Sequence, residues 1–340
     1  MKTAIGIVLA MATTTVIAAA AADPEAAPVA KGVAPGVWMI PGGIRPDLQP
    51  DGNTVVFEAP EGLVVVDTGR HEWHRAAILR LARERGRPVA AVVNTHWHLD
   101  HVSGNPGLRA AYPGLRVHAS VAINGALEGF LAESAKDAAA YLSDPQVPEA
   151  TREDIRADLR TIENGAALRP DVAIERSGVL HIGGRDFAVH LARDAVTAGD
   201  VWLYDESSRV AVLGDLVTLP APFLDTACPE GWRAALEEVT GVPFEVAIPG
   251  HGRPMSREEV ARYRGALDGF VDCARSTAPA ADCATRWTEA VEPLFEDVAE
   301  DEPRARGLAR YYVDMLRANG GRSRHCAATD GGSRGSSLTP

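Results

Sequence analysis

Hydrophobic and polar residues follow two patterns in the first third of the chain, and together they predict a mixed α/β fold. Short apolar runs separated by turn residues, which are typical of strands, occur as GVWMI, NTVVFEA and GLVVVD between residues 36 and 67. Residues 72–86 instead carry apolar side chains at the spacing of an amphipathic helix that ends at Gly86. The continuous apolar run of residues 88–93 then predicts a strand that is covered on both faces.

The rest of the chain repeats this order of strands followed by helices. Residues 123–168 are rich in alanine and helical in pattern, apolar runs between residues 171 and 215 predict a second set of strands, and further helices reach residue 319. Two similar halves that pack sheet to sheet are therefore expected. We divide the chain into a domain at residues 33–265 with a helical insertion at about 123–168, a C-terminal helical extension at 266–319, and a tail at 320–340. The tail is rich in Gly and Ser, and we expect it to be disordered apart from Cys326.

The first 22 residues predict a secretory signal peptide. A basic residue, Lys2, precedes an apolar stretch from Ala4 to about Ala19, and small residues of the Ala-x-Ala type follow. The apolar stretch is short for a membrane span, and the polar sequence that begins at Asp23 carries no basic flank that would stop transfer. We therefore expect a periplasmic or secreted protein without a stable membrane anchor.

Charge and cysteine content narrow the choice of partner and compartment. The formal net charge of −12 gives the chain no bulk attraction for nucleic acid, so a small-molecule substrate is the expected partner. Four cysteines in an exported chain permit disulfides. Cys273 and Cys283 bracket a short loop between two helical patterns and are the preferred pair, whereas Cys228 and Cys326 are either a second pair or two free, inert thiols.

The densest cluster of chemically active side chains is THWHLDH, residues 95–101, directly after the predicted buried strand. Further along, LGDL at residues 213–216 and IPGHG at residues 248–252 each place an acidic or imidazole side chain after a glycine at the end of a predicted strand. Imidazoles and carboxylates gathered in this way are typical ligands of a divalent metal. The spacing differs from that of the helical His-Glu-x-x-His site, whose histidines lie four residues apart.

This arrangement resembles the metallo-β-lactamase superfamily. The signature Thr-His-x-His-x-Asp-His stands at residues 95–101, Asp-Thr-Gly at residues 67–69, Gly-Asp at residues 214–215 and Gly-His at residues 250–251. Their order and approximate spacing hold over roughly residues 33–265. The resemblance implies an α/β fold of the four-layer αβ/βα sandwich type, with a metal site in the cleft between the two sheets.

The resemblance also implies a role for each matching residue. Two metals would share six ligands: His96 and His98 for the first, Asp100, His101 and His251 for the second, and Asp215 as the bridge between them. Asp67 would steady the ligand loop, and Asp100 would be the catalytic residue that orients the nucleophile or moves its proton. Zinc is the expected cofactor, with one or two ions per chain, and the same ligands also suit iron.

One position departs from the family pattern. Aligning Gly199 and Asp200 places Val196 where family members usually carry a further metal-binding histidine, and a valine side chain cannot bind a metal. Three interpretations are open: a single metal in the second site, a substitute ligand such as Asp194 or His190, or a catalytically silent relative.

The expected function is metal-dependent hydrolysis outside the cytoplasm. The bond would be an ester, thioester, lactone or β-lactam, with a metal-bound hydroxide as the nucleophile. The alternative is a non-catalytic metal-binding accessory protein that retains the fold with an incomplete first metal site.

Two histidines near the cluster have a simpler explanation. His71 and His74 follow the Asp-Thr-Gly stretch at the start of a predicted helix, where surface histidines are commoner than histidines that line a cleft. We expect both to lie on the surface.

Overall fold

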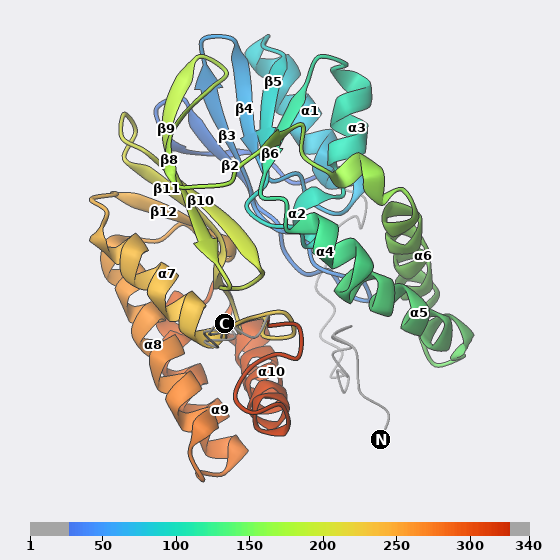
Figure 1. The fold of residues 1–340 in the computed structure, drawn as a ribbon, viewed down its shortest axis with the longest axis vertical. Helices are drawn as coiled ribbons and strands as arrows, with labels where there is room; N and C mark the ends of the chain where they lie inside the picture. Colours follow the sequence, from blue (N-terminus) through green and yellow to red (C-terminus); the bar gives the residue numbers. More distant parts are fainter. Residues whose placement is uncertain (1–26, 327–340) are drawn as a thin grey trace, which may run out of the picture.

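The computed structural model describes residues 27–326, which form two β-sheets packed face to face between layers of helices (Figure 1). This architecture confirms the predicted α/β sandwich. The first sheet holds its strands in chain order: β1 (Lys31–Ala34), β2 (Val37–Ile40), β3 (Thr54–Ala59), β4 (Gly62–Val66), β5 (Val89–Val93), β6 (Arg116–Ala119) and β7 (Val172–Ala173). The second sheet runs in the order β12 (Val246–His251), β11 (Val210–Thr218), β10 (Gly199–Asp205), β9 (Arg185–Arg193) and β8 (Gly178–Ile182).

Side-chain alternation along the strands builds the core between the sheets and the two outer cores at the same time. In β3, Val55 and Phe57 face the second sheet, whereas Val56 between them packs toward the helices. In β10, Leu203 faces the first sheet and Trp202 packs toward the helices on the other side. Both faces of these strands are covered, which explains why their sequences are continuously apolar. Burial of each large side chain contributes about 1.5–3 kcal/mol to folding.

Helices cover the outer face of each sheet. Against the first sheet lie α1 (Glu72–Arg85) and α3 (Asn105–Ala111), and α1 ends at Gly86 with a left-handed φ of 62°, as the sequence predicts. Against the second sheet lie α7 (Pro229–Gly241) and α8 (Arg257–Arg275). The remaining C-terminal elements are α9 (Ala280–Val291), the 3-10 turn η2 (Glu292–Leu294) and α10 (Val298–Ala318), which extend the core around α8.

A group of helices lies between β6 and β7, over the residues that the sequence assigns to an insertion. It consists of α4 (Ile123–Glu128), α5 (Phe130–Ser143), α6 (Glu149–Glu163) and the 3-10 turn η1 (Gly165–Leu168). Figure 1 shows these helices, in green, beside the short helix α2 (Leu99–Val102). Ile123 of α4 packs in one apolar cluster with Trp97 and Leu99, so the insertion supports the loop that carries the predicted metal ligands.

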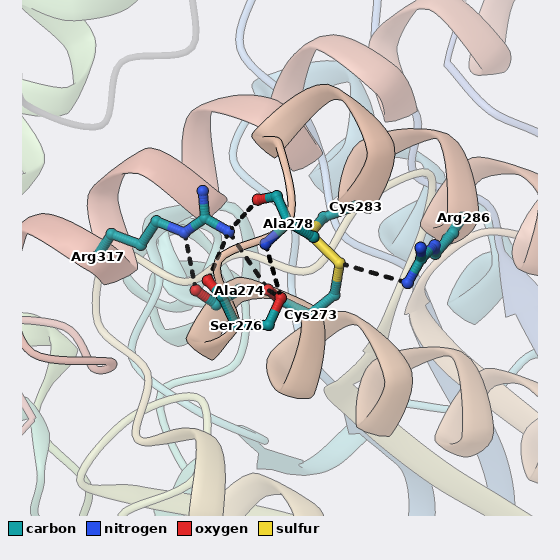
Figure 2. Close-up of a disulfide and its surroundings, with 7 residues drawn as sticks. All are labelled: Cys273, Ala274, Ser276, Ala278, Cys283, Arg286 and Arg317. Atoms are coloured by element: carbon teal, nitrogen blue, oxygen red, sulfur yellow. Dashed lines mark hydrogen bonds between the residues drawn. A yellow bond between two sulfur atoms is a disulfide. The ribbon is translucent and has the colours of Figure 1, made fainter.

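The predicted disulfide between Cys273 and Cys283 is confirmed, and it joins α8 to α9. Figure 2 shows the guanidinium of Arg317, in α10, beside this bond, where it donates hydrogen bonds to backbone carbonyl oxygens within residues 273–278. The disulfide and Arg317 together fix the junction of the three C-terminal helices.

The second pair of cysteines also forms a disulfide, because Cys228 at the start of α7 is joined to Cys326. The predicted signal peptide, residues 1–22, lies outside the described residues, as does the part of the predicted tail beyond Cys326. Residues 320–326 of that tail are described, with Ser323 buried and Cys326 bonded to Cys228. In the part of the chain from residue 27 to residue 326, no helix has the length and apolar composition needed to cross a bilayer.

Removal of the Cys273–Cys283 disulfide should weaken the fold without changing the metal centre. The bond closes a loop of sequence separation 10, and cross-linking such a loop stabilises by about 2–3 kcal/mol. We expect the double variant Cys273→Ser/Cys283→Ser to lose this amount in guanidinium unfolding, with wild-type metal content. An unchanged unfolding midpoint would mean that packing and Arg317 hold the helical junction unaided.

Candidate metal centre

The metal-ligand candidates come from strands of both sheets. The stretch of residues 95–101 leaves β5 and enters α2, Asp215 lies in β11, and His251 is the last residue of β12. Because β11 and β12 pair in parallel, Asp215 and His251 meet near the same edge of the second sheet. The structure thus brings residues more than 100 positions apart to one place between the sheets.

A first group of ligand candidates consists of His96, His98 and Asp215. His96 Nε2 lies 3.5 Å from Asp215 Oδ2, and His98 Nδ1 lies 3.6 Å from the same oxygen. All three side chains are buried, and their ligand atoms lie within 4.8 Å of one another. Two imidazole nitrogens and one carboxylate oxygen therefore converge on one point.

A second group consists of Asp100, His101 and His251. Asp100 Oδ2 lies 3.0 Å from His251 Nε2 and 3.6 Å from His101 Nε2, and the two imidazole nitrogens are 3.4 Å apart. This group also presents two imidazole nitrogens and one carboxylate oxygen. The two groups therefore offer the same kinds of ligand atom.

Asp215 faces both groups, in the position that the resemblance gives to the bridging ligand. Its Oδ2 belongs to the first group, while its Oδ1 lies 3.2 Å from His101 Nε2 and 3.5 Å from His251 Nε2. Although burial raises the pKa of Asp215, the imidazoles of His101, His251 and His96 hold it well below its usual range. The bridging position is therefore occupied by a carboxylate anion.

The donor set fits divalent metal ions. His96 Nε2 and Asp215 Oδ1 are buried and have no hydrogen-bond partner among residues 27–326, although unpartnered buried polar atoms are rare in folded proteins. Burial lowers the pKa of His101, but Asp215, Asp67 and Asp100 raise it well above its ordinary value, so this place favours positive charge. Imidazole nitrogens and carboxylate oxygens are ligands of zinc and of iron.

Asp67, the predicted support of the ligand loop, fixes the orientation of two imidazoles. His101 Nδ1 donates to Asp67 Oδ2 over 2.8 Å, and the Thr95 hydroxyl donates to the same oxygen over 2.6 Å. Since the Thr95 proton is used in this way, Thr95 Oγ1 accepts a hydrogen bond from His96 Nδ1, 2.9 Å away. When the two imidazoles are neutral, these hydrogen bonds hold the proton on Nδ1 of His96 and His101, and Nε2 is the nitrogen that faces the ligand groups, as metal binding requires.

Two glycines permit the close packing of this centre. A Cβ atom at Gly52 would overlap the imidazole ring of His101, and a Cβ atom at Gly250 would overlap Asp215 Oδ1. Any larger residue at either position would displace a ligand candidate. The Gly-His pattern at residues 250–251 therefore has a steric reason in addition to the ligand that it supplies.

Comparison with known proteins identifies the family to which the chain belongs. The model of the metallo-beta-lactamase superfamily matches residues 49–251, which is more than half of the chain. The chain belongs to this superfamily. The matched region contains all six ligand candidates and Asp67.

Individual relatives in the superfamily are distant. The linear primary-alkylsulfatase of a Pseudomonas species is 26% identical over 231 residues, which cover 60% of this chain and 42% of that protein. Among solved structures, the metallo-beta-lactamase of Pontibacter korlensis has a TM-score of 0.52 at 18% identity and covers 70% of this chain and 98% of that one. The sec-alkylsulfatase Pisa1 of a Pseudomonas species has a TM-score of 0.54 at 20% identity and covers 73% and 42%. This chain spans half or less of the length of the curated relatives that it matches.

Neither of the substitute ligands considered for the first metal joins a ligand group. Asp194 is half-buried in a turn with a φ of 52°, and the ligand groups found within residues 27–326 do not include it. His190 lies on the outer face of the second sheet, where its ring stacks on Trp202 and its Nδ1 lies 2.8 Å from Glu238 Oε1. The first group of this superfamily member therefore has Asp215 and two histidines, as Val196 implies.

Arg70 connects the metal centre to the helical insertion. Its Nη1 lies 2.5 Å from Asp158 Oδ2 in α6, and its Nη2 lies 3.7 Å from Asp100 Oδ1. Burial lowers the pKa of Arg70, but the charges of Asp158 and Asp100 raise it above its ordinary value, so the guanidinium stays charged. Because Oδ1 of Asp100 faces Arg70, Oδ2 is the oxygen that faces His251.

The expectation that His71 and His74 lie on the surface is wrong, because both side chains are buried. His71 Nδ1 lies 2.8 Å from Asp51 Oδ2, and His71 Nε2 lies 2.8 Å from Asp154 Oδ1 in α6. His74 Nε2 lies 2.8 Å from Thr54 Oγ1. Hydrogen-bonding partners in distant segments thus remove the cost of burying these rings.

Sequence reasoning missed the partners that Arg70 and His71 find in other segments. Asp51 and Asp154 are 20 and 83 positions away from His71, and Asp158 is 88 positions away from Arg70. None of the three belongs to a motif. The only signal in the sequence was their charge within otherwise ordinary loop and helix patterns, which does not reveal a partner.

Stability should fall as pH rises through the titration of His71. Burial lowers the pKa of His71, but its hydrogen bonds with Asp154 and Asp51 raise it to about 9. A histidine whose pKa is higher in the folded state stabilises fully below its unfolded value of about 6.5, and this contribution disappears as pH rises through about 9. We expect a loss of about 3 kcal/mol across this window in denaturant unfolding.

The variant His71→Asn should be less stable at pH 6 and should lack this part of the pH dependence. His181→Asn is the matched control, because His181 is exposed and its ion-pair partner within residues 27–326 is Asp186 of its own hairpin. Equal pH profiles for wild type and His71→Asn would contradict the assignment.

Proposed function

We propose that the protein is an exported, metal-dependent hydrolase that cleaves an ester-type bond in a small molecule with an apolar group. The observation that carries the proposal is the pair of buried ligand groups, each with two imidazoles and one carboxylate, that meet at Asp215. A structural metal site has no need of this bridged pair, whereas hydrolytic sites of the two-metal type do. Membership in the metallo-beta-lactamase superfamily supports the same conclusion.

Zinc is the proposed cofactor, held by His96, His98 and Asp215 in the first group and by Asp100, His101, His251 and Asp215 in the second. When bound, such an ion lowers the pKa of coordinated water to about 7 and polarises the bond under attack. The chain supplies the geometry. Asp67 orients His101 directly and orients His96 through Thr95, so that the Nε2 atoms of both rings face the ligand groups.

Asp100 is the proposed catalytic carboxylate. Although burial raises its pKa, His101, His251 and Arg70 hold it below the usual range, so the group is an anion. Arg70 faces its Oδ1, and its Oδ2 lies among the ligand atoms of the second group. Asp100 is therefore placed to orient the attacking water or to move its proton, while the charge of Arg70 stabilises the carboxylate as an anion.

Aromatic side chains near the first group support an apolar substrate. Phe223 lies with its ring centroid 5.0 Å from that of His98, Trp97 lies 4.7 Å from His98, and Phe130 of α5 lies 5.6 Å from Trp97. Phe130 and Phe223 are only half-buried, so they can contact a ligand. Esters and thioesters of apolar chains, sulfate esters included, fit this surface, and the two alkylsulfatases among the relatives point the same way. Lactones and β-lactams are the other candidate substrates.

Loss of the Asp100 carboxylate should abolish turnover while the fold persists. We expect Asp100→Asn to lower kcat/KM at least 100-fold on the best substrate from a panel of an aryl octanoate, an acyl thioester, an alkyl sulfate, a lactone and a β-lactam. Asp314→Asn, an exposed carboxylate in α10, is the control and should act as wild type. Circular dichroism would check the fold, and native mass spectrometry would count the metals.

Two metals per chain with turnover on one of these substrates would support the hydrolase. Bound metal without turnover on any of them would favour the accessory protein that Val196 suggests, because the first group has one ligand fewer than the family pattern. A chain that binds no metal under zinc-replete conditions would contradict both functions.

Export is proposed from the signal-like sequence of residues 1–22, and the two disulfides suit an oxidising compartment. We expect the full chain, expressed in a Gram-negative host, to be recovered from the periplasm with a mass that corresponds to cleavage near Ala22. Recovery of the uncleaved chain from the cytoplasm would refute this part of the proposal.

A further inference from the structure

A threonine outside every motif contacts the metal-ligand candidate His98. Thr226 lies in the loop between β11 and α7, and its Oγ1 is 3.1 Å from His98 Nε2. Its side chain is buried, with an exposed fraction of 3% for the residue. The two residues are 128 positions apart, so the contact is a product of the fold.

The direction of this hydrogen bond follows from a second contact. The Thr226 hydroxyl donates to the backbone carbonyl oxygen of Val196 over 2.8 Å, and a carbonyl oxygen can only accept. The single hydroxyl proton is therefore used, and only lone pairs of Oγ1 face His98. Nε2 of His98 must then carry the proton, while Nδ1 is unprotonated and faces Asp215 Oδ2 at 3.6 Å.

We propose that Thr226 is a positioning residue, which fixes His98 in the tautomer that offers Nδ1 to a metal in the first group. The inference rests on the metal centre of the proposed function. The arrangement parallels that of Thr95, whose hydroxyl donates to Asp67 and accepts from His96. The side chain of Val196 cannot bind a metal, but its backbone carbonyl oxygen accepts the hydrogen bond that orients the Thr226 hydroxyl beside His98.

The loop that carries Thr226 is held on several sides, as a positioning role requires. The backbone N–H of Cys228 donates to the carbonyl oxygen of Ala195 over 2.7 Å, next to Val196. Cys228 is also joined to Cys326 by a disulfide. On the other side of Thr226, the carboxylate of Asp225 accepts a hydrogen bond from the Tyr312 hydroxyl of α10 over 3.0 Å. The loop therefore links the β9–β10 turn to the C-terminal helices.

The first test removes the hydroxyl and measures metal affinity. Thr226→Val keeps the shape of the side chain but cannot bind His98 Nε2, whereas Thr226→Ser retains the hydroxyl. We expect Thr226→Val to bind one of its two zinc ions 10–100-fold more weakly, in competition with a chromophoric chelator, and Thr226→Ser to stay within about threefold of wild type. Thr288→Val removes a buried hydroxyl of α9 that donates to the Ala284 carbonyl oxygen, and it controls for the loss of a buried threonine. Wild-type affinity for both ions in Thr226→Val would overturn the proposal.

The second test observes the tautomer directly in metal-free wild-type protein. Nitrogen-15 chemical shifts at pH 8 distinguish the two neutral forms of an imidazole, and the signals of His98 are those that vanish in His98→Gln. We expect protonated Nε2 and unprotonated Nδ1, and a mixture of tautomers in Thr226→Val. Protonated Nδ1 in the wild type would refute the positioning role. This measurement needs neither metal nor turnover, so it tests the positioning role of Thr226 even if Thr226→Val misfolds. It does so also if the chain binds no metal. Failure to bind metal would count against the proposed function alone.

Discussion

The buried carboxylate of Asp215 is the constraint around which the rest of the centre is arranged. An ionised carboxylate without compensation is very costly in a protein interior, so positive charge or donors must surround it. Imidazoles of both ligand groups supply this environment, and His96, His101 and His251 hold the pKa of Asp215 down. Gly250 leaves room for its Oδ1, which no side chain within residues 27–326 satisfies with a hydrogen bond. A cation shared by the two sheets is the chemistry that this arrangement accommodates best.

Imidazoles bind metals only when the correct nitrogen is unprotonated, and each ligand histidine therefore needs a neighbour that meets this requirement. Asp67 meets it on the side of the first sheet, directly for His101 and through Thr95 for His96. Thr226 meets it for His98 from the side of the second sheet. The two halves of the sandwich are thus joined by an oriented polar centre in addition to the apolar core between the sheets.

The sequence predicts those parts of the molecule whose cause is local. The apolar run before residues 95–101 gives a buried strand, and the cluster that follows it has the spacing of a ligand loop, so both were predictable. The disulfide between Cys273 and Cys283 also depends on neighbours in the chain. The partners of His71 were not predictable, because Asp51 and Asp154 reach it through the packing of separate segments. For the same reason, no local pattern distinguishes Thr226 from any other loop threonine.

Two segments outside the ligand loops, helix α6 and the end of the described chain at Cys326, hold residues that contact the ligand candidates. The carboxylates of α6 hold Arg70 and His71 in place, and Arg70 faces the outer oxygen of Asp100. On the opposite side, the disulfide from Cys228 to Cys326 ties the loop of Thr226 to a residue well beyond the matched region of the superfamily. Each attachment acts on a different ligand group. Val196 offers no ligand atom, and the first group within the described residues consists of His96, His98 and Asp215. The orientation of each of these three side chains therefore matters, and the attachment at Thr226 acts on that of His98.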